Sequence, residues 1–124
     1  MKFSYSKAEK LKSRKTIESL FTEGKSVGVF PLRLFYIEVP ESETSLTKTA
    51  VSVSKKNFKL AVHRNLIKRL LREAFRLNKN LILDNSSKKY ALLFLYVGKD
   101  MPDFDLLNKS IKKVMHKFIE QTKN

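Results

Sequence analysis

The 124-residue sequence contains no cysteine, which excludes disulfide bonds, thiolate nucleophiles and cysteine-ligated zinc. Glycine and proline occur three times each, so there is little room for flexible linkers, and no repeat or low-complexity stretch divides the chain. No hydrophobic run approaches the roughly 20 residues that span a bilayer, and residues 1–7 lack the apolar core of a signal peptide. We therefore expect one cytoplasmic domain over residues 1–124, with 42% hydrophobic residues to build its core.

Acidic residues are also scarce, with 12 Asp and Glu against 26 Lys and Arg, and the formal net charge is +14. Half of this excess lies in residues 55–76, where Glu73 is the only acid. The basic residues of this segment are Lys55, Lys56, Lys59, Arg64, Lys68, Arg69, Arg72 and Arg76. Charge gathered in one segment makes a binding surface, whereas evenly spread charge mainly affects solubility. The pattern therefore favours a polyanionic partner.

Hydrophobic periodicity predicts helices alternating with strands. The expected elements are a helix at 14–21, strands at 29–39 and 48–54, a helix at 60–77, a strand at 90–97, and a helix that begins after Asp103. We expect the first two strands to form a hairpin through a turn at 40–45. The continuous apolar run at 90–97 is typical of a central strand that is covered on both faces. This order predicts an α+β fold, a single-domain α/β sandwich with a mixed sheet of about four strands and three helices (α-β-β-(β)-α-β-α).

The segment from Leu60 to Leu77 is the strongest helix in the sequence. At about 100° per residue, five cations gather around Asn65 on one side of this helix. The opposite side is aliphatic and can pack on a sheet; it comprises Leu66, Ile67, Leu70, Leu71 and Ala74. Neighbouring like charges repel one another, and a bound anion would relieve that repulsion. Four of the five cations are arginines, whose guanidinium groups make bidentate contacts with phosphate.

The residues around this helix resemble the signature of the bacterial ribonuclease P protein subunit. The resemblance is carried by Val53-Ser54-Lys55-Lys56, by Arg64-Asn65 followed at fixed spacing by Lys68-Arg69, and by Arg72 through Arg76. The spacing Arg-Asn-x-x-Lys-Arg-x-x-Arg is far more specific than a generic basic run. Similar residues at 11–26 and at Leu34-Phe35-Tyr36 extend the resemblance over nearly the whole chain.

The resemblance implies a protein cofactor of a catalytic RNA. In that family the complex removes the 5′ leader of precursor tRNA by Mg²⁺-dependent hydrolysis, and the RNA, which binds most of the Mg²⁺, performs the chemistry. The protein binds the catalytic RNA through the motif helix and holds the single-stranded leader in a cleft. The family fold is ribosomal protein S5 domain 2-like, with a left-handed β-α-β crossover around the motif helix.

The resemblance also implies two sets of site residues. The RNA-binding set is Lys55, Lys56, Lys59, Arg64, Asn65, Lys68, Arg69, Arg72 and Arg76. The leader-cleft set is Phe21, Leu34, Tyr36, Phe58, Arg64 and Lys68. Phe58 belongs to a slightly longer loop than is common in the family. Ile17 occupies a position that is often a second phenylalanine, and it cannot stack on a base as a ring can.

No pattern indicates that the chain itself is a catalyst or binds a metal. His63 lies toward the apolar side of the motif helix and is expected to be a packed or edge residue, and His116 is expected on a solvated face. Asp103 and Asp105 are typical of helix-start charges, and Asp103 can cap the last helix.

Three alternative functions share some of these features. A generic RNA-binding or ribosome-associated chaperone would have the same charge but would leave the motif spacing unexplained. A membrane-surface protein could use the motif helix as a basic amphipathic anchor, although that helix has no tryptophan. A self-sufficient nuclease would need a catalytic constellation that we do not find. We expect neither a membrane nor DNA as a partner.

Overall fold

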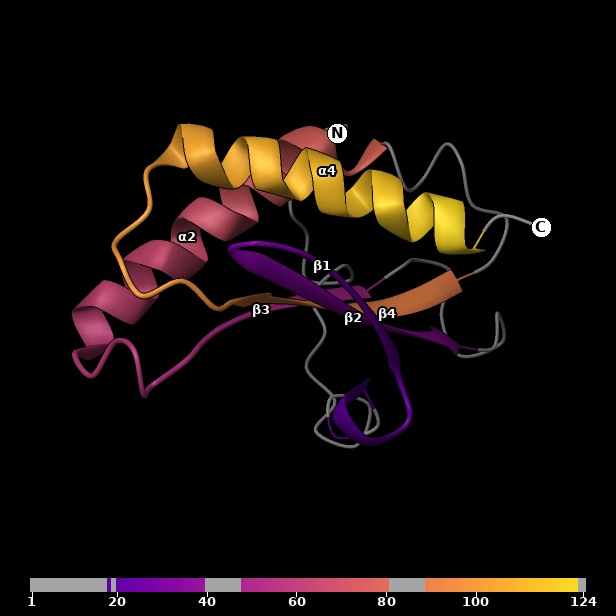
Figure 1. The fold of residues 1–124 in the computed structure, drawn as a ribbon, viewed down its shortest axis with the longest axis horizontal. Helices are drawn as coiled ribbons and strands as arrows, with labels where there is room; N and C mark the ends of the chain where they lie inside the picture. The colour runs from indigo at the N-terminus through magenta and orange to yellow at the C-terminus, as the bar shows by residue number, and fades with distance from the viewer. Residues whose placement is uncertain (1–17, 19, 40–47, 81–88, 123–124) are drawn as a thin grey trace.

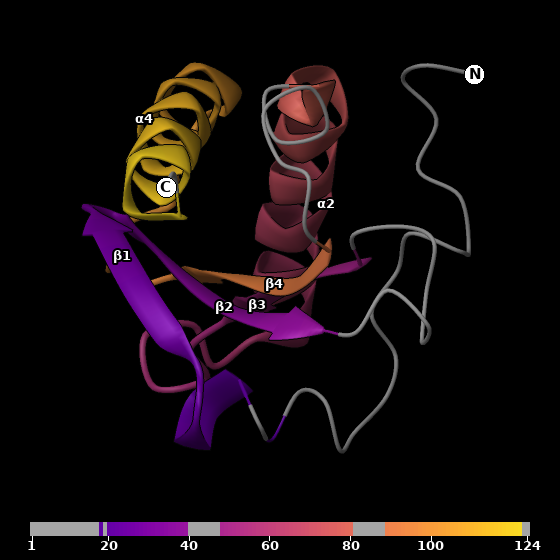
Figure 2. The same cartoon turned by 90° about the vertical axis from the view of Figure 1, so that its right-hand side faces the viewer.

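The computed structural model describes residues 18, 20–39, 48–80 and 89–122. It has two layers, a four-stranded sheet and a pair of helices that cover one face of the sheet (Figures 1 and 2). The elements are β1 (Lys25–Val29), β2 (Leu32–Val39), β3 (Lys48–Val53), α2 (Ala61–Asn78), β4 (Lys89–Tyr96) and α4 (Phe104–Thr122). Residues 18 and 20–22 are helical and are the only described part of the helix expected at 14–21. The expected turn at 40–45 and Ile17 lie outside the described residues.

The strands are arranged in the order β1-β2-β4-β3. β1 pairs with β2 and β2 pairs with β4, both antiparallel, whereas β3 and β4 are parallel. The sheet is therefore mixed, as expected, and β4 is a central strand. The expected hairpin between residues 29–39 and 48–54 is wrong, because β4 lies between β2 and β3. The segment before 32 instead forms its own strand, β1, and Pro31, which has no N–H to donate to a ladder, lies in the turn between β1 and β2.

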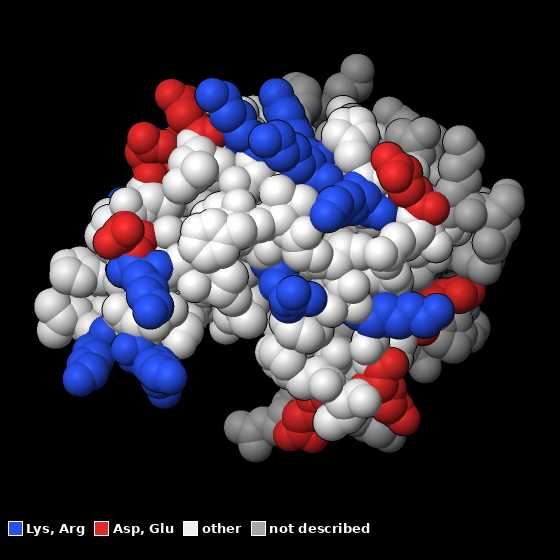
Figure 3. All heavy atoms as spheres, in the orientation of Figure 1, with Lys and Arg blue, Asp and Glu red and all other residues white. Residues whose placement is uncertain are grey.

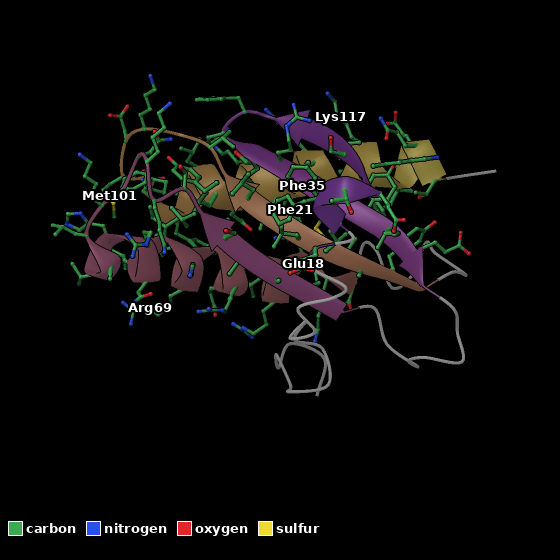
Figure 4. All side chains as sticks on the ribbon, turned by 90° about the horizontal axis from the view of Figure 1, so that it is seen from below. Glu18, Phe21, Phe35, Arg69, Met101 and Lys117 are labelled. Carbon is green, nitrogen blue, oxygen red and sulfur yellow. The ribbon has the colours of Figure 1, made fainter. Side chains whose placement is uncertain are left out.

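The connection from β3 through α2 to β4 is a left-handed crossover. Both strands run in the same direction, and α2 returns between them on the face that also carries α4 (Figures 1 and 4). Right-handed crossovers predominate strongly in proteins, so the handedness is a distinctive feature of this fold. Because β3 is an edge strand and α2 packs on it, the crossover places the motif helix at the edge of the sheet.

The main core lies between the sheet and the two helices. Alternate strand residues point into it, as the period of two requires. The largest fully buried side chains of this core are Phe94, Phe118, Leu32, Leu34, Ile67, Leu71, Leu92, Leu107, Ile111 and Met115. In β3 the predicted alternation is confirmed, since Thr49 and Val53 are buried with this core while Ala50 packs on the other face.

The opposite face of the sheet, here called the open face, has a smaller apolar cluster. It is built on Leu20, Ala91 and Leu93, with Phe35, Ile37 and Ala50 packed against them and partly exposed. In the part of the chain that the structure describes, only the helical residues 18 and 20–22 lie over this face (Figure 4). Neither α2 nor α4 covers it.

Candidate nucleic-acid interface

The cationic face of α2 comprises Arg64, Asn65, Lys68, Arg69, Arg72 and Arg76. Asn65, Arg69 and Arg72 are exposed, and Lys68 is half-buried. In Figure 4 the side chain of Arg69 projects away from the sheet. The buried side of the helix is formed by Ile67, Leu71, Ala74, Phe75 and Asn78. The predicted division of α2 into an apolar side and a cationic side is therefore confirmed.

One predicted inward position on α2 differs from the expectation, because Leu66 is 37% exposed instead of packing on the sheet. His63, predicted to be a packed or edge residue, is exposed. The cause is that the sheet and α4 together cover only part of the apolar side. Val62, Leu66 and Leu77 remain on the surface of α2. His116 on α4 is exposed, as predicted.

Arg64 differs from Lys68, Arg69 and Arg72 because its guanidinium is used within the protein. Its Nη1 donates hydrogen bonds to the carbonyl oxygens of Phe58, at 2.7 Å, and Lys59, at 2.9 Å. Hydrogen bonds from a charged donor are stronger than neutral ones. Arg64 therefore fixes the basic loop, residues 54–60, against the start of α2. Its neighbours on the outer surface remain available, since Lys55, Lys56 and Lys59 are all exposed.

Buried contacts also hold the basic loop from beneath. The Phe58 ring is 6% exposed and packs on the Tyr96 ring, with 6.0 Å between ring centroids. Asn57 Nδ2 donates to the carbonyl oxygen of Gly98 at 3.3 Å. The loop that carries three exposed lysines is thus anchored to the end of β4. Phe58, which was predicted for the leader cleft, is buried in the core and anchors this loop.

Arg76 forms an ion pair with Glu73 one turn earlier on α2. The hydrogen bonds from Arg76 hold the pKa of Glu73 below its usual value, and the same contact raises the pKa of Arg76. Both side chains are partly exposed, so the pair adds little to stability. It does reduce the net charge at the carboxyl-terminal end of the cationic face. The strongest uncompensated charge therefore lies in the middle of α2.

The strand residues predicted for the leader cleft lie in the main core. Leu34 is completely buried, and Tyr36 is 5% exposed with its ring against Phe118, 4.8 Å between centroids. The Tyr36 hydroxyl donates to Gln121 Oε1 at 2.8 Å, and burial raises the pKa of the Tyr36 phenol. Phe21 lies on the other side of the sheet. The structure therefore does not bring these three residues together, and it buries Leu34 and Tyr36, which were predicted to line the leader cleft.

Phe35 is the residue that the sequence analysis missed. It lies between Leu34 and Tyr36 in β2, so its side chain points to the open face. The rings of Phe21 and Phe35 are 5.1 Å apart at an interplanar angle of 54°, and Phe21 is 51% exposed (Figure 4). Two aromatic rings on an otherwise apolar and partly exposed surface form a platform on which an unpaired base can stack. The sequence carries one signal for this: successive side chains of a strand point to opposite faces, so Phe35 must face away from Leu34 and Tyr36.

The described residues offer no grouping that suggests a reaction centre. They contain no set of three or more His, Asp or Glu side chains placed to hold a metal ion. Asp103 Oδ1 accepts a hydrogen bond from the Leu106 N–H at 2.8 Å, which confirms the predicted helix cap. Within these stretches, neither helix has the length and apolarity needed to cross a membrane.

Comparisons with known proteins identify a family for this chain. The family model described as Ribonuclease P matches residues 5–119. The ribonuclease P protein component of Porphyromonas gingivalis is 41% identical over 114 residues, covering 90% of this chain and 83% of the relative. That of Chlorobium phaeobacteroides is 35% identical over 126 residues, covering 91% and 86%.

Solved structures give the same result for the fold. The RNase P protein of Staphylococcus aureus superimposes with a TM-score of 0.73 at 22% identity, covering 90% of this chain and 96% of that one. The RNase P protein of Thermotoga maritima gives 0.71 at 22% identity, covering 88% and 96%.

The two-layer fold and the outward cationic residues of α2 define a small basic α+β protein. The matches identify it further, because the chain belongs to the ribonuclease P protein family. It is accordingly the protein component of a ribonucleoprotein that matures the 5′ ends of tRNA, in which the catalytic groups belong to the RNA.

Proposed function

We propose that this protein uses two adjoining surfaces in ribonuclease P. The cationic face of α2 and the basic loop bind the catalytic RNA, and the open face of the sheet holds the 5′ leader of precursor tRNA. The observation that carries the proposal is the exposure of Asn65, Arg69 and Arg72 on one side of a helix whose other side holds its buried residues. We place this activity in the bacterial cytoplasm, within one domain spanning residues 1–124.

Arginine and lysine have different parts in the first surface. Arg69 and Arg72 present planar guanidinium groups that can each contact two phosphate oxygens. Lys55, Lys56 and Lys59 add mobile point charges on a loop whose backbone is fixed by Arg64. Asn65 can both donate and accept, so it can contact a base edge or a ribose hydroxyl that a cation would not distinguish. Arg64 contributes mainly by positioning the loop.

The leader surface is assigned to the open face because of its chemistry. Phe21 and Phe35 provide rings for stacking, and Ala50 and Ser52 of the edge strand leave room for a chain to lie across the sheet. The exposed Arg33, whose Nη1 donates to Ser26 Oγ at 2.9 Å, borders this face and can contact the leader backbone. Lys68 is kept in the proposal as a half-buried cation on α2, the helix that packs against β3.

Mg²⁺ belongs to the proposal as a cofactor of the RNA. When bound, it supplies an activated water and charge stabilisation for phosphodiester hydrolysis. The phosphates of the catalytic RNA are its main ligands. The protein contributes by reducing phosphate repulsion, which allows the RNA fold and substrate to form at lower Mg²⁺ concentration.

Reconstitution tests this function directly. The chain is added to a protein-free bacterial ribonuclease P RNA and a precursor tRNA at low Mg²⁺, and release of the leader is measured. We expect clear stimulation by the unaltered chain and loss of most of it in R69Q/R72Q, whose fold is checked by circular dichroism. RNA binding without any stimulation would favour a generic RNA chaperone and would refute the proposal.

A further inference from the structure

The outer face of α4 carries a second group of cations that the proposed function does not use. This lysine face consists of Lys109, Lys112, Lys113 and Lys117, all exposed. The spacing follows the helical repeat, and the buried side of α4 (Leu107, Ser110, Ile111, Val114, Met115 and Phe118) packs toward the core. Figure 3 shows blue side chains gathered over α4, apart from those at the lower left of the molecule.

The lysine face has no internal acid to neutralise it. Asp105 and Glu120 bracket it, and residues 106–119 contain no acidic residue. No carboxylate of the described residues lies within ion-pair distance of these four lysines. Lys117 Nζ donates to the carbonyl oxygen of Gly28 at 3.2 Å, and this contact leaves its charge unneutralised. Four like charges along two helical turns repel one another unless an anion lies across them.

The chemistry of this face fits a duplex better than an unpaired strand. The lysine face has no exposed Phe or Tyr, so it lacks the stacking platform that single strands require. It also has no arginine for bidentate base or phosphate contacts, and lysine acts on phosphate as a point charge. From Lys109 to Lys117 the helix rises about 12 Å, and a duplex carries roughly one phosphate per 1.7 Å of axis. A helix of this length can therefore approach several phosphates at once.

We propose that the lysine face of α4 binds the phosphate backbone of double-helical RNA, as a contact separate from that of α2. The two surfaces belong to neighbouring helices, which are joined where Asn78 Nδ2 donates to Asn108 Oδ1 at 2.7 Å. The two helices lie side by side on the same face of the sheet (Figure 2), and the exposed lysines of α4 lie opposite its buried residues. The protein would thus bridge two RNA segments. The proposal rests on the proposed function only in taking RNA as the partner.

The test measures binding of the full chain to an RNA duplex and to a single strand of the same length as the salt concentration is varied. The variant K109Q/K112Q/K113Q removes three exposed lysines whose side chains form no ion pair or hydrogen bond among the described residues, and K109R/K112R/K113R is the matched control that keeps their charge. For the duplex, we expect the slope of log K against log[salt] to fall in magnitude by about 2.7 in the glutamine variant, and affinity at low salt to fall at least about tenfold. The arginine variant should retain both.

Three results would overturn the proposal. The first is an unchanged salt slope for the duplex in the glutamine variant, and the second is an equal loss of duplex affinity in the arginine variant. The third comes from a parallel measurement with anionic lipid vesicles: the glutamine variant loses affinity for the vesicles while its affinity for the duplex persists. The reconstitution assay with R69Q/R72Q distinguishes this failure from failure of the proposed function. If the α4 variant behaves as the unaltered chain while R69Q/R72Q loses stimulation, only the α4 contact is wrong. If the unaltered chain gives no stimulation, the proposed function is wrong, and the duplex measurement still decides the α4 contact.

Discussion

Replacing Phe35 with leucine tests the leader surface without removing its apolar packing. Leucine keeps contact with the neighbouring Leu93 but has no π-face to offer to a base. Because Phe35 is only partly buried, we expect F35L to cost less than about 1.5 kcal/mol of folding free energy. The loss of one base stack is worth about 1–3 kcal/mol, so affinity for precursor tRNA should fall roughly 5- to 150-fold. Mature tRNA, which has no leader, should bind with unchanged affinity.

The matched control is Y36F, at the next position in the same strand. Its side chain lies in the main core, so it should leave the affinity for precursor tRNA unchanged and lose only the hydrogen bond to Gln121. The assay is equilibrium binding of both tRNAs to the reconstituted particle, with urea unfolding to confirm that each variant is folded. An equal loss for mature tRNA in F35L, or a leader-specific loss in Y36F instead, would refute the assignment of the leader to the open face.

Three further predictions concern groups that the structure shows in contact. R64Q should destabilise the protein by about 1–3 kcal/mol in urea unfolding because two charged hydrogen bonds to the basic loop are lost, and R69Q, which has no such bonds, should leave stability nearly unchanged. E73Q should strengthen RNA binding and steepen its salt dependence, because the ion pair between Glu73 and Arg76 is lost. Lowering the pH through the depressed pKa of Glu73 should have the same effect on RNA binding. It should also remove the small stability that the ion pair supplies above the ordinary carboxyl pKa. The pKa values of Tyr36 and Tyr96 are raised, so both phenols stay protonated in the folded state at a pH where they ionise in the unfolded chain. The free energy of unfolding should therefore decline as pH rises above about 10. Y36F/Y96F should flatten that decline in alkaline unfolding curves.

The sequence predicted the features that depend on local periodicity. The bounds of α2, its cationic side and the alternation of β3 follow from residue spacing alone. The strand order could not be predicted this way, since pairing β2 with β4 joins residues that are about sixty positions apart. The separation of residues 25–39 into β1 and β2 was missed because the apolar run continues through the turn at Pro31.

The burial of Leu34 and Tyr36, which were predicted for the leader cleft, could not be foreseen for a related reason. β2 is apolar or aromatic at Leu34, Phe35, Tyr36 and Ile37, so both of its faces look suited to burial and the sequence does not indicate which is covered. Only the packing of α4 against Tyr36 decides it. The internal use of Arg64 was equally invisible, because its acceptors are backbone carbonyls that carry no sequence signal.

The central claim is that the exposed middle of α2 lies against the catalytic RNA, and the absence of cysteine from the chain allows a direct test. A single thiol introduced as Arg69→Cys or Arg72→Cys, and as Glu23→Cys for comparison, can carry a photoactivated crosslinker in the reconstituted particle. Both α2 positions should crosslink at a few defined nucleotides of the catalytic RNA, with much lower yield from position 23. Crosslinks from position 23 alone, or from none of the three, would contradict the account.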